Sequence, residues 1–241
     1  MINKKNVVAV ILAKGFSRHL PNKNIRKILG KPLIYYSIKA AQESKLIDRV
    51  IVSTDSDKIA KIARHYGAEV PFKRPVILAT NTAHTPPVIQ HALRFLERKE
   101  NYHTDIVVTL QPTSPLRKKG VVDDMIRMLE KGKYDSVISV VNVGGYHPWW
   151  MSKMKGKKLV PFMKVPSGTD PYNLERQQLP TVLKQNGSVY VTRAKSLFKN
   201  NNIIIDENCG AYLMDEIYSL DIDNYTDLLL VEIIMKQMRK K

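Results

Sequence analysis

Cysteine is nearly absent from the chain, which has Cys209 alone among its 241 residues. A single cysteine cannot form an internal disulfide, so we expect a fold without such cross-links, in a reducing compartment. Long uncharged apolar runs are also missing, because charged residues interrupt each one before it reaches membrane-spanning length. The first apolar run follows two lysines, as in a signal peptide, but it meets Lys14 at once and lacks a small-residue cleavage pattern. We therefore expect a cytoplasmic protein without a membrane segment.

Several signatures of metal, nucleotide and nucleic-acid binding are missing too. The sequence has no zinc-binding histidine spacing, no Walker A or G-x-G-x-x-G motif, and no arginine-rich arm. Acidic residues are scarce, at 22 against 39 basic ones, which gives a net charge of +17. Such an excess suits phosphate-rich partners, although a lysine-rich surface that serves solubility would give the same total. Because the basic residues are spread along the chain, we expect no nucleic-acid partner.

What is present is the pattern of a globular α/β protein. The chain is 44% hydrophobic and 25% charged, and its length suits one sizeable domain. Short β-branched runs alternate with amphipathic stretches, which predicts a three-layer, Rossmann-like fold whose mostly parallel sheet binds its ligand at the carboxyl ends of the strands. The predicted strands are 7–13, 49–54, 106–111, 136–141 and 188–192. The predicted helices are 33–44, 57–66, 86–98, 121–130 and 225–236.

This alternation stops after the fourth predicted strand. Residues 142 to about 180 are rich in glycine, proline, lysine and aromatic residues, and no clear period runs through them. A long irregular insertion is usually functional, an interaction arm, or disordered. Trp149, Trp150, Phe162 and Tyr172 argue against disorder, because such side chains are usually buried. We expect a single domain over residues 1–241 with an inserted arm at about 142–180 that packs on a second subunit.

The loop after the first predicted strand, "AKGFSRHLPNKN" at residues 13–24, is dense in hydrogen-bond donors. Gly15 permits close backbone approach, and amides in such a turn can donate to phosphate oxygens. Positive charge and further hydrogen-bonding groups come from the side chains of Lys14, Ser17, Arg18, Lys23 and Asn24. We predict an anion site here. The alternative is a surface turn in which the lysines are incidental.

A pair of aspartates occurs late in the chain, in "SLDID" at residues 219–223. In an extended segment, Asp221 and Asp223 would point to the same side and could share a hard cation. Mg²⁺ usually takes one or two carboxylates together with phosphate oxygens, so the pair suits a nucleoside triphosphate site. The alternative is that one aspartate caps the helix predicted to start near residue 225.

Two further stretches leave or enter predicted strands with polar residues. In "LQPTSPLR", two prolines hold Gln111 and its neighbours near the end of a strand, although an ordinary turn would look the same. In "ERQQLPTVLKQNGSVY", Arg176 and Lys184 could bind a carboxylate or a phosphate, and Asn186-Gly187 predicts a turn. A third stretch, "STD" at 53–55, is adequately explained by capping of the next helix.

Six segments, taken together and in this order, resemble the acylneuraminate cytidylyltransferases, or CMP-sialic acid synthetases, and their legionaminic and pseudaminic acid relatives. They are "VVAVILAKGFSRHLPNKNIRKILGKPLI", "DRVIVSTDSDKIAKIARHYGAEV", "KRPVILATNTA", "LQPTSPLR", "RQQLPTVLKQNGSVY" and "SLDIDNYTDL". The resemblance implies an α/β nucleotidyltransferase with a dimerisation extension exchanged between the subunits of a homodimer. It implies that CTP and Mg²⁺ activate a nine-carbon acidic sugar, giving a CMP-sugar and pyrophosphate.

The resemblance also implies roles for individual residues. It assigns binding of the CTP phosphates and ribose to Ala13, Lys14, Gly15, Ser17, Arg18, Lys23 and Asn24, and binding of cytosine to Arg74, Ala83 and Thr85. It assigns binding of the sugar to Gln111, Arg176, Lys184, Asn186 and Tyr190. It assigns binding of Mg²⁺ to Asp221 and Asp223, which with Lys14, Arg18 and Lys23 form the expected catalytic set.

The chain departs from the family pattern at a few positions. Lys14 stands where an arginine is usual, and Asn81 stands where an aspartate is common. An aromatic pair near the sugar in some sialic acid enzymes is replaced by Ile203, Ile204 and Ile205. An aliphatic wall suits a legionaminic or pseudaminic acid, which ends in a methyl group, better than neuraminate. The alternatives are an enzyme for the eight-carbon acid Kdo or another sugar nucleotidyltransferase and, more distantly, a non-catalytic polyanion-binding protein. A tetramer is also compatible with the sequence.

Overall fold

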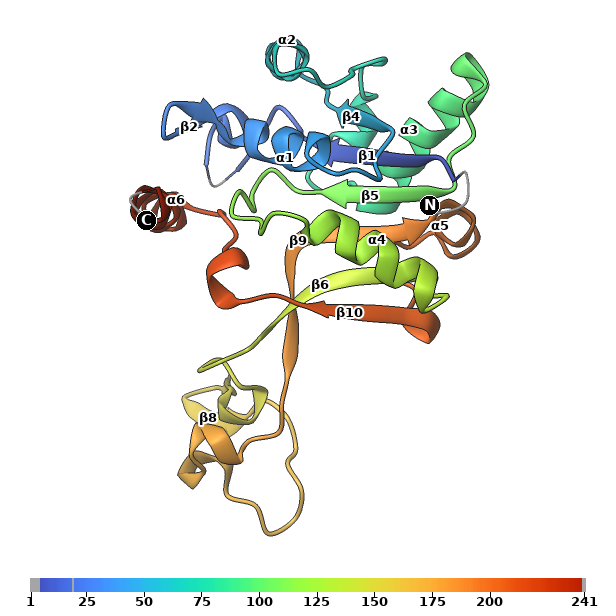
Figure 1. Cartoon of the computed structure of the whole chain (residues 1–241). Helices are drawn as coiled ribbons and strands as arrows, with labels where there is room; N and C mark the ends of the chain where they lie inside the picture. The colour runs from blue at the N-terminus through green and yellow to red at the C-terminus, as the bar shows by residue number, and fades with distance from the viewer. Residues whose placement is uncertain (1–4, 19, 240–241) are drawn as a thin grey trace.

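A computed structural model describes residues 5–18 and 20–239 of the chain. Its main strands are β1 Val7–Leu12, β4 Arg49–Ser53, β5 Ile106–Leu110, β6 Ser136–Asn142, β9 Leu183–Arg193 and β10 Cys209–Leu213. They form one sheet with the order β10-β6-β9-β5-β1-β4 (Figure 1). β1 pairs in parallel with β4 and β5, β6 pairs in parallel with β10, and β9 runs antiparallel between β5 and β6. The predicted mostly parallel α/β sheet is confirmed.

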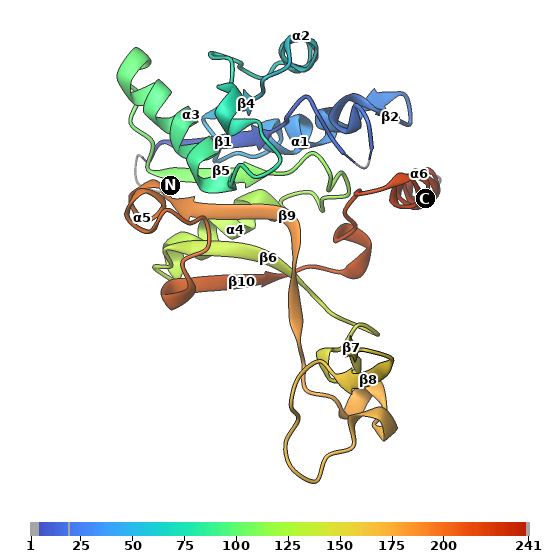
Figure 2. The same ribbon diagram turned by 180° about the vertical axis from the view of Figure 1, so that it is seen from behind.

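Helices cover both faces of this sheet (Figures 1 and 2). They are α1 Leu33–Gln42, α2 Asp57–His65, α3 Thr85–Glu100, α4 Val121–Lys131, α5 Ala194–Asn200 and α6 Tyr225–Met238. Apolar side chains of α1, α2 and α4 pack on one face of the sheet, and those of α3 and α5 pack on the other. α6 instead packs beside the strand ends, against Leu20, Ile28 and Leu33. Among residues 5–18 and 20–239, no helix is long and apolar enough to cross a membrane.

Local sequence signals explain several of these boundaries. α2 begins after Ser56, whose hydroxyl accepts a hydrogen bond from the amide of Ile59, and it ends before Gly67, whose φ of +81° favours glycine. The buried run at the start of β1 fits a strand that is covered on both faces. The first four predicted strands differ from the observed ones only at their ends.

Short elements complete the body of the chain: β2 Lys27–Ile28, β3 Lys31–Pro32, and 3₁₀ turns at Lys23–Ile25, Val76–Leu78, Asp206–Asn208 and Glu216–Tyr218.

Between β6 and β9 the chain leaves the sheet. Residues 143–182, called the arm from here on, extend away from the sheet in both views (Figures 1 and 2). The arm contains the hairpin of β7 Ser152–Lys155 and β8 Lys158–Pro161, and 3₁₀ turns at Pro148–Trp150, Pro171–Asn173 and Arg176–Gln178. Its surface is unusually apolar, because Met154, Leu159, Phe162 and Tyr172 are all more than half exposed.

The sequence-based boundaries of β9 were wrong. The predicted turn at Asn186-Gly187 is a bulge inside one long strand: Ile138 pairs with Tyr190 and Val140 pairs with Gln185, so residues 186–189 stand opposite Ser139 alone. Gly187 has a φ of +74°, which a bulge tolerates best with glycine. Two further elements were not predicted: α5, which covers part of one face of the sheet, and β10, which forms one edge of it.

Candidate active site

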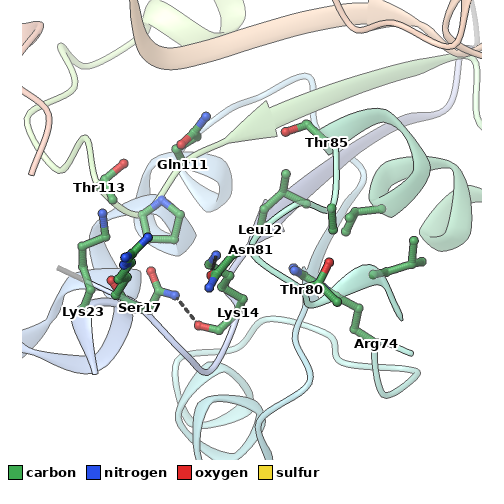
Figure 3. Close-up of a pocket in the computed structure, with 16 residues that line it drawn as sticks. Leu12, Lys14, Ser17, Lys23, Arg74, Thr80, Asn81, Thr85, Gln111 and Thr113 are labelled. Carbon is green, nitrogen blue, oxygen red and sulfur yellow. Dashed lines mark hydrogen bonds between the residues drawn. The ribbon is translucent and has the colours of Figure 1, made fainter. Parts of the chain in front are cut away.

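A pocket of about 410 Å³ opens at the carboxyl ends of β1 and β5. In Figure 3, Lys23, Ser17 and Thr113 lie toward one end of it, and Arg74, Thr80 and Thr85 lie toward the other. The pocket brings together nine of the sequence-predicted site residues: Lys14, Ser17, Arg18, Lys23, Asn24, Arg74, Ala83, Thr85 and Gln111. It is completed by residues to which the sequence analysis gave no role, namely Leu12, Leu78, Thr80, Asn81, Val88, Pro112 and Thr113.

The loop after β1 is held in place by its own polar groups. The side chain of Asn24 is buried and donates to the carbonyl oxygen of Lys14 at 2.8 Å, which is the dashed line in Figure 3. The Lys14 ammonium in turn donates to Asn81 Oδ1 at 2.9 Å. The amide of Gly15 donates to Asp55 Oδ1 at 2.8 Å, so this amide is already engaged by a carboxylate rather than free for a phosphate. Ala13 and Gly15 support the loop without lining the pocket.

Gly15 is required by close packing. A Cβ at this position would lie 3.0 Å from the Cβ of Ser56 and 3.3 Å from Asp55 Oδ2. The helix cap of α2 is Ser56, so Asp55 is available for two other contacts that the sequence did not reveal. It accepts the Gly15 amide, and its charge stabilises the protonated form of Arg74. The signal that could have found it is the position of Asp55 directly after a buried strand.

Arg74 is the most enclosed cation of the pocket, with 5% of its surface exposed. Its guanidinium donates to the hydroxyl of Ser53 at 3.0 Å and to the Ser53 carbonyl, and its amide donates to the carbonyl of Thr54 at 2.8 Å. Burial lowers the pKa of Arg74 to about 10, and the charge of Asp55 opposes that shift. Arg74 therefore remains charged at neutral pH in a position fixed by the end of β4.

The two predicted aspartates lie next to the cationic loop. Lys23 Nζ donates to Asp223 Oδ1 at 3.1 Å and to the carbonyl of Ile222 at 3.0 Å. Ile222 is fully buried while Asp221 and Asp223 on either side of it are exposed, which is the alternation expected of an extended segment, although no strand forms here. The first loop and the D-I-D segment are therefore in direct contact.

Neither aspartate caps the following helix. The cap of α6 is Asn224, whose Oδ1 accepts the amide of Asp227 at 3.0 Å, while Asp227 accepts the amides of Asp223 and Asn224 in return. The capping alternative for the aspartate pair is therefore wrong. Asp221 accepts a hydrogen bond from Ser114 Oγ at 3.2 Å.

The pair suits Mg²⁺ better than a soft metal. Both carboxylates are exposed hard-oxygen donors, and two of them are enough for an ion that also binds phosphate oxygens. Across residues 5–18 and 20–239, no group of three or more histidine, cysteine, aspartate or glutamate side chains gathers as a metal site. A metal site built by the protein alone is thus not present in this part of the chain, whereas one shared with a triphosphate fits the residues.

Most of the residues assigned to the sugar lie outside the pocket. Asn186 is buried in the β9 bulge, where it accepts from Ser139 Oγ at 2.6 Å and donates to Ser219 Oγ at 2.9 Å. Tyr190 is also buried, and its pKa is raised first by burial and then by the negative charge of Asp221. Arg176 and Lys184 are exposed: Arg176 lies 3.7 Å from Glu216, and Lys184 Nζ lies 5.9 Å from the centre of the Tyr146 ring.

The three consecutive isoleucines are placed in the core rather than in the pocket. Ile203 and Ile205 are buried, and Ile203 and Ile204 belong to the same apolar cluster as Tyr190. Ile203 is tied to β9 by its carbonyl, which accepts a hydrogen bond from Thr192 Oγ1 at 2.7 Å. The prediction that these isoleucines form an aliphatic wall beside the sugar is therefore wrong, because they pack in the core and none of them lines the pocket.

Comparison with known proteins identifies the class of enzyme. A family model described as cytidylyltransferase matches residues 8–204, so the chain belongs to the cytidylyltransferase family. It is 34% identical to the CMP-N,N'-diacetyllegionaminic acid synthase of Legionella pneumophila, over 95% of this chain and 96% of that one. It is 33% identical to the post-translational flagellin modification protein B of Campylobacter coli, over 96% of this chain and 95% of that one.

More distant relatives agree with this placement. The N-acylneuraminate cytidylyltransferase of Escherichia coli is 29% identical over 99% of this chain and 54% of its own length. Among solved structures, a CMP:2-keto-3-deoxy-manno-octonic acid synthetase in complex with CTP aligns with a TM-score of 0.69 at 16% identity, over 97% of this chain and 100% of that one. At that identity the structural likeness supports the fold alone, which is the nucleotidyltransferase fold predicted from the sequence.

Proposed function

We propose that this cytidylyltransferase activates a nine-carbon acidic sugar of the sialic, legionaminic or pseudaminic type with CTP, giving a CMP-sugar and pyrophosphate. One observation carries the proposal: Lys23 of the first loop contacts Asp223 at 3.1 Å, at the edge of a pocket whose other end holds Arg74. Cations for a triphosphate and carboxylates for a hard cation therefore meet at one place. The names of the relatives support the sugar class.

The proposed reaction is an in-line displacement at phosphorus. The anomeric hydroxyl of the sugar attacks the α-phosphorus of CTP, so that one P–O bond forms while the bond to the pyrophosphate leaving group breaks. Lys14, Arg18 and Lys23 oppose the negative charge that grows on pyrophosphate. Asp221 and Asp223 would hold Mg²⁺, which supplies charge neutralisation at the phosphates. The protein mainly positions the reactants, and Arg74, Ala83 and Thr85 at the far end of the pocket orient the cytosine.

The sugar we favour is a legionaminic- or pseudaminic-type acid. The predicted aliphatic wall does not support this choice, because Ile203 and Ile205 are buried beside Thr192 and Ser136, at the end of the sheet opposite the pocket. Two relatives carry names with these sugars, the legionaminic acid synthase described above and a pseudaminic acid cytidylyltransferase of Campylobacter jejuni, which is 39% identical over 48% of this chain and 49% of its own.

The test is pyrophosphate release by the purified protein across a matrix of sugars and nucleotides. We expect turnover with CTP and Mg²⁺, no turnover with UTP, and a higher kcat/KM for legionaminic or pseudaminic acid than for N-acetylneuraminate and Kdo. A strong preference for neuraminate would reject the proposed sugar choice and leave the reaction intact. Salt-sensitive binding of arbitrary oligonucleotides without pyrophosphate release would instead support a polyanion-binding protein.

We also propose that the arm makes a homodimer and covers the sugar of the partner subunit. Its exposed apolar side chains, Met154, Leu159, Phe162 and Tyr172, are of the kind that form the core of protein interfaces. Phe162→Asp should convert the dimer to a monomer in light scattering and raise the KM for sugar. Phe198→Asp, which changes an exposed aromatic residue on α5, is the matched control and should leave both unchanged. Assembly beyond a dimer and a cytoplasmic location stay predictions.

A further inference from the structure

We infer that Arg117 is a positioning residue that fixes the sugar side of the site by holding the end of β5 against the β9 bulge. The inference rests on the proposed function. Arg117 closes the "LQPTSPLR" stretch, yet neither the sequence analysis nor the reaction described above gives it a role. Its guanidinium does not line the pocket, so any effect on the reaction passes through the groups that it holds.

The contacts of Arg117 join three elements that are distant in the sequence. Nη2 donates to the carbonyl of Gln111 at 2.5 Å and to the carbonyl of Ser188 at 2.9 Å, and Nε donates to the same Ser188 carbonyl at 3.1 Å. Nη1 donates to the hydroxyl of Ser37 in α1 at 2.9 Å. The Ser37 hydroxyl donates in turn to the Gln111 carbonyl at 3.0 Å. One side chain therefore sets the spacing between β5, β9 and α1.

Both backbone segments that Arg117 holds carry residues assigned to the sugar. Gln111 lines the pocket directly after β5. Ser188 lies in the bulge, where its amide donates to Asn186 Oδ1 at 3.1 Å. A shift of the Ser188 carbonyl would therefore move Asn186 relative to Gln111. Positions assigned to CTP, such as Lys14 and Arg74, have no hydrogen bond to Arg117 and would be left in place.

The charge of Arg117 is not explained by stability alone. None of its three hydrogen-bond acceptors is a carboxylate, although enclosing a cation without a bonded counter-charge is costly. Burial lowers the pKa of Arg117 to about 9, and the charge that opposes this shift is that of Asp221. The guanidinium is thus still protonated at neutral pH, and its field acts on one of the two proposed magnesium ligands.

Arg193 at the other end of β9 offers a matched control. Its guanidinium also clamps backbone carbonyls, those of Tyr134 at 2.8 Å and Leu129 at 3.3 Å, but it is paired with Glu130 at 2.7 Å. Arg193 pairs with Ile106 at the start of β5, whereas Gln111 follows the end of that strand. Both arginines hold backbone carbonyls of neighbouring segments together, at opposite ends of the sheet, and of the two only Arg117 is near the site.

The experiment compares Arg117→Lys with Arg193→Lys in steady-state pyrophosphate release, with sugar and CTP varied separately. Lysine keeps the charge but loses the fork that reaches two carbonyls. We expect Arg117→Lys to raise the KM for sugar roughly ten-fold or more, with the KM for CTP within about two-fold of wild type. Arg193→Lys should lower Tm and leave both KM values unchanged. Ser37→Ala, a milder change in the same network, should raise the sugar KM a few-fold.

Two results would overturn the inference. One is a sugar KM that stays at the wild-type value in both Arg117→Lys and Ser37→Ala. The other is an equal rise of the KM for sugar and for CTP, or the same rise in Arg193→Lys, because either pattern marks a general loss of stability. If wild-type protein released no pyrophosphate with any acidic sugar, the proposed function would fail instead, so the two failures are distinguishable.

Discussion

Arg74 and Lys184 are both cations assigned to the candidate site, and the chain holds them in opposite ways. Arg74 is buried at the end of β4 and bonded to Ser53, whereas Lys184 is exposed on the part of β9 that leads to the arm, near the ring of Tyr146. The buried Asn24 of the first loop contrasts with the exposed Arg176 in the same way. The nucleotide side is thus shaped in advance by the sheet, while the sugar side has exposed groups that a sugar or a second subunit would order.

The largest effect is expected where the two sides meet, at Asp223. Asp223→Asn keeps the shape but removes a charged oxygen ligand from the proposed magnesium site and the partner of Lys23. We expect kcat to fall by roughly 10²–10³-fold, with Tm unchanged because this side chain is exposed. Glu232→Gln on α6 is the control and should be fully active. Near-normal turnover of Asp223→Asn at saturating CTP would remove this aspartate from the mechanism.

The second-largest effect should distinguish the nucleotide side of the site from the sugar side, because only the KM for CTP should change. Arg74→Lys loses the paired bonds to Ser53 in a buried position, so we expect the KM for CTP to rise by roughly 10–100-fold and stability to fall by about 2 kcal/mol. The KM for sugar should change little. Initial rates at varied CTP and urea unfolding measure the two effects. A rise in the sugar KM alone would contradict the division of the site.

Variants of the exposed cations on the sugar side should change the KM for sugar and not the KM for CTP. Arg176→Ala and Lys184→Ala remove charges that have few bonds in the free protein, so Tm should stay at the wild-type value. Each should raise the KM for the acidic sugar roughly ten-fold by loss of a charge-assisted hydrogen bond, with the KM for CTP unchanged. Lys157→Ala, in the exposed turn of the arm hairpin, is the control. A higher KM for CTP in either site variant would contradict the division of the site into a nucleotide side and a sugar side.

The smallest expected effect is on the pH dependence of stability, and it comes from His91, which lies near the buried Arg74. His91 packs against Phe72 with ring centres 4.8 Å apart, and its pKa is lowered by burial and by Arg74. The unfolded chain therefore takes up a proton on this histidine more readily than the folded one. Stability should fall as the pH drops below about 6.5, by at most about 1.4 kcal/mol per pH unit from this group. Urea unfolding of His91→Leu should show a weaker pH dependence, and an identical profile would contradict this account.

The two regions also differ in how far the sequence predicts them. The first loop and the aspartates were predicted because each follows or approaches a strand end, where parallel strands gather their ligand groups. Asp55 and Arg117 were missed because their roles arise from contacts with Gly15 and with Ser188, which are distant in the sequence. The β9 bulge was missed because Asn-Gly is typical of a turn, and only Ser139 from β6 makes it a bulge.

The shorter elements were missed for a different reason. α5 has seven residues, which is fewer than the roughly 11–18 over which a helical apolar pattern is identified. β10 is an edge strand that contains Gly210, which weakens the strand signal further. The sequence thus predicts elements whose pattern is long and continuous, and tertiary pairing decides the rest.

The pairing of Asn142 with Leu183 has a consequence for how such enzymes diversify. The arm begins directly after Asn142 and ends directly before Leu183, and the amide of Val143 still donates to the carbonyl of Val182 at 3.0 Å, so the two ends of the arm are held together. An exchange of residues 143–182 for a tight hairpin turn, or for the corresponding piece of a relative, would leave the register of the sheet untouched. If the arm binds the sugar and the partner subunit as proposed, its exchange would change sugar choice and assembly while the sheet keeps its register.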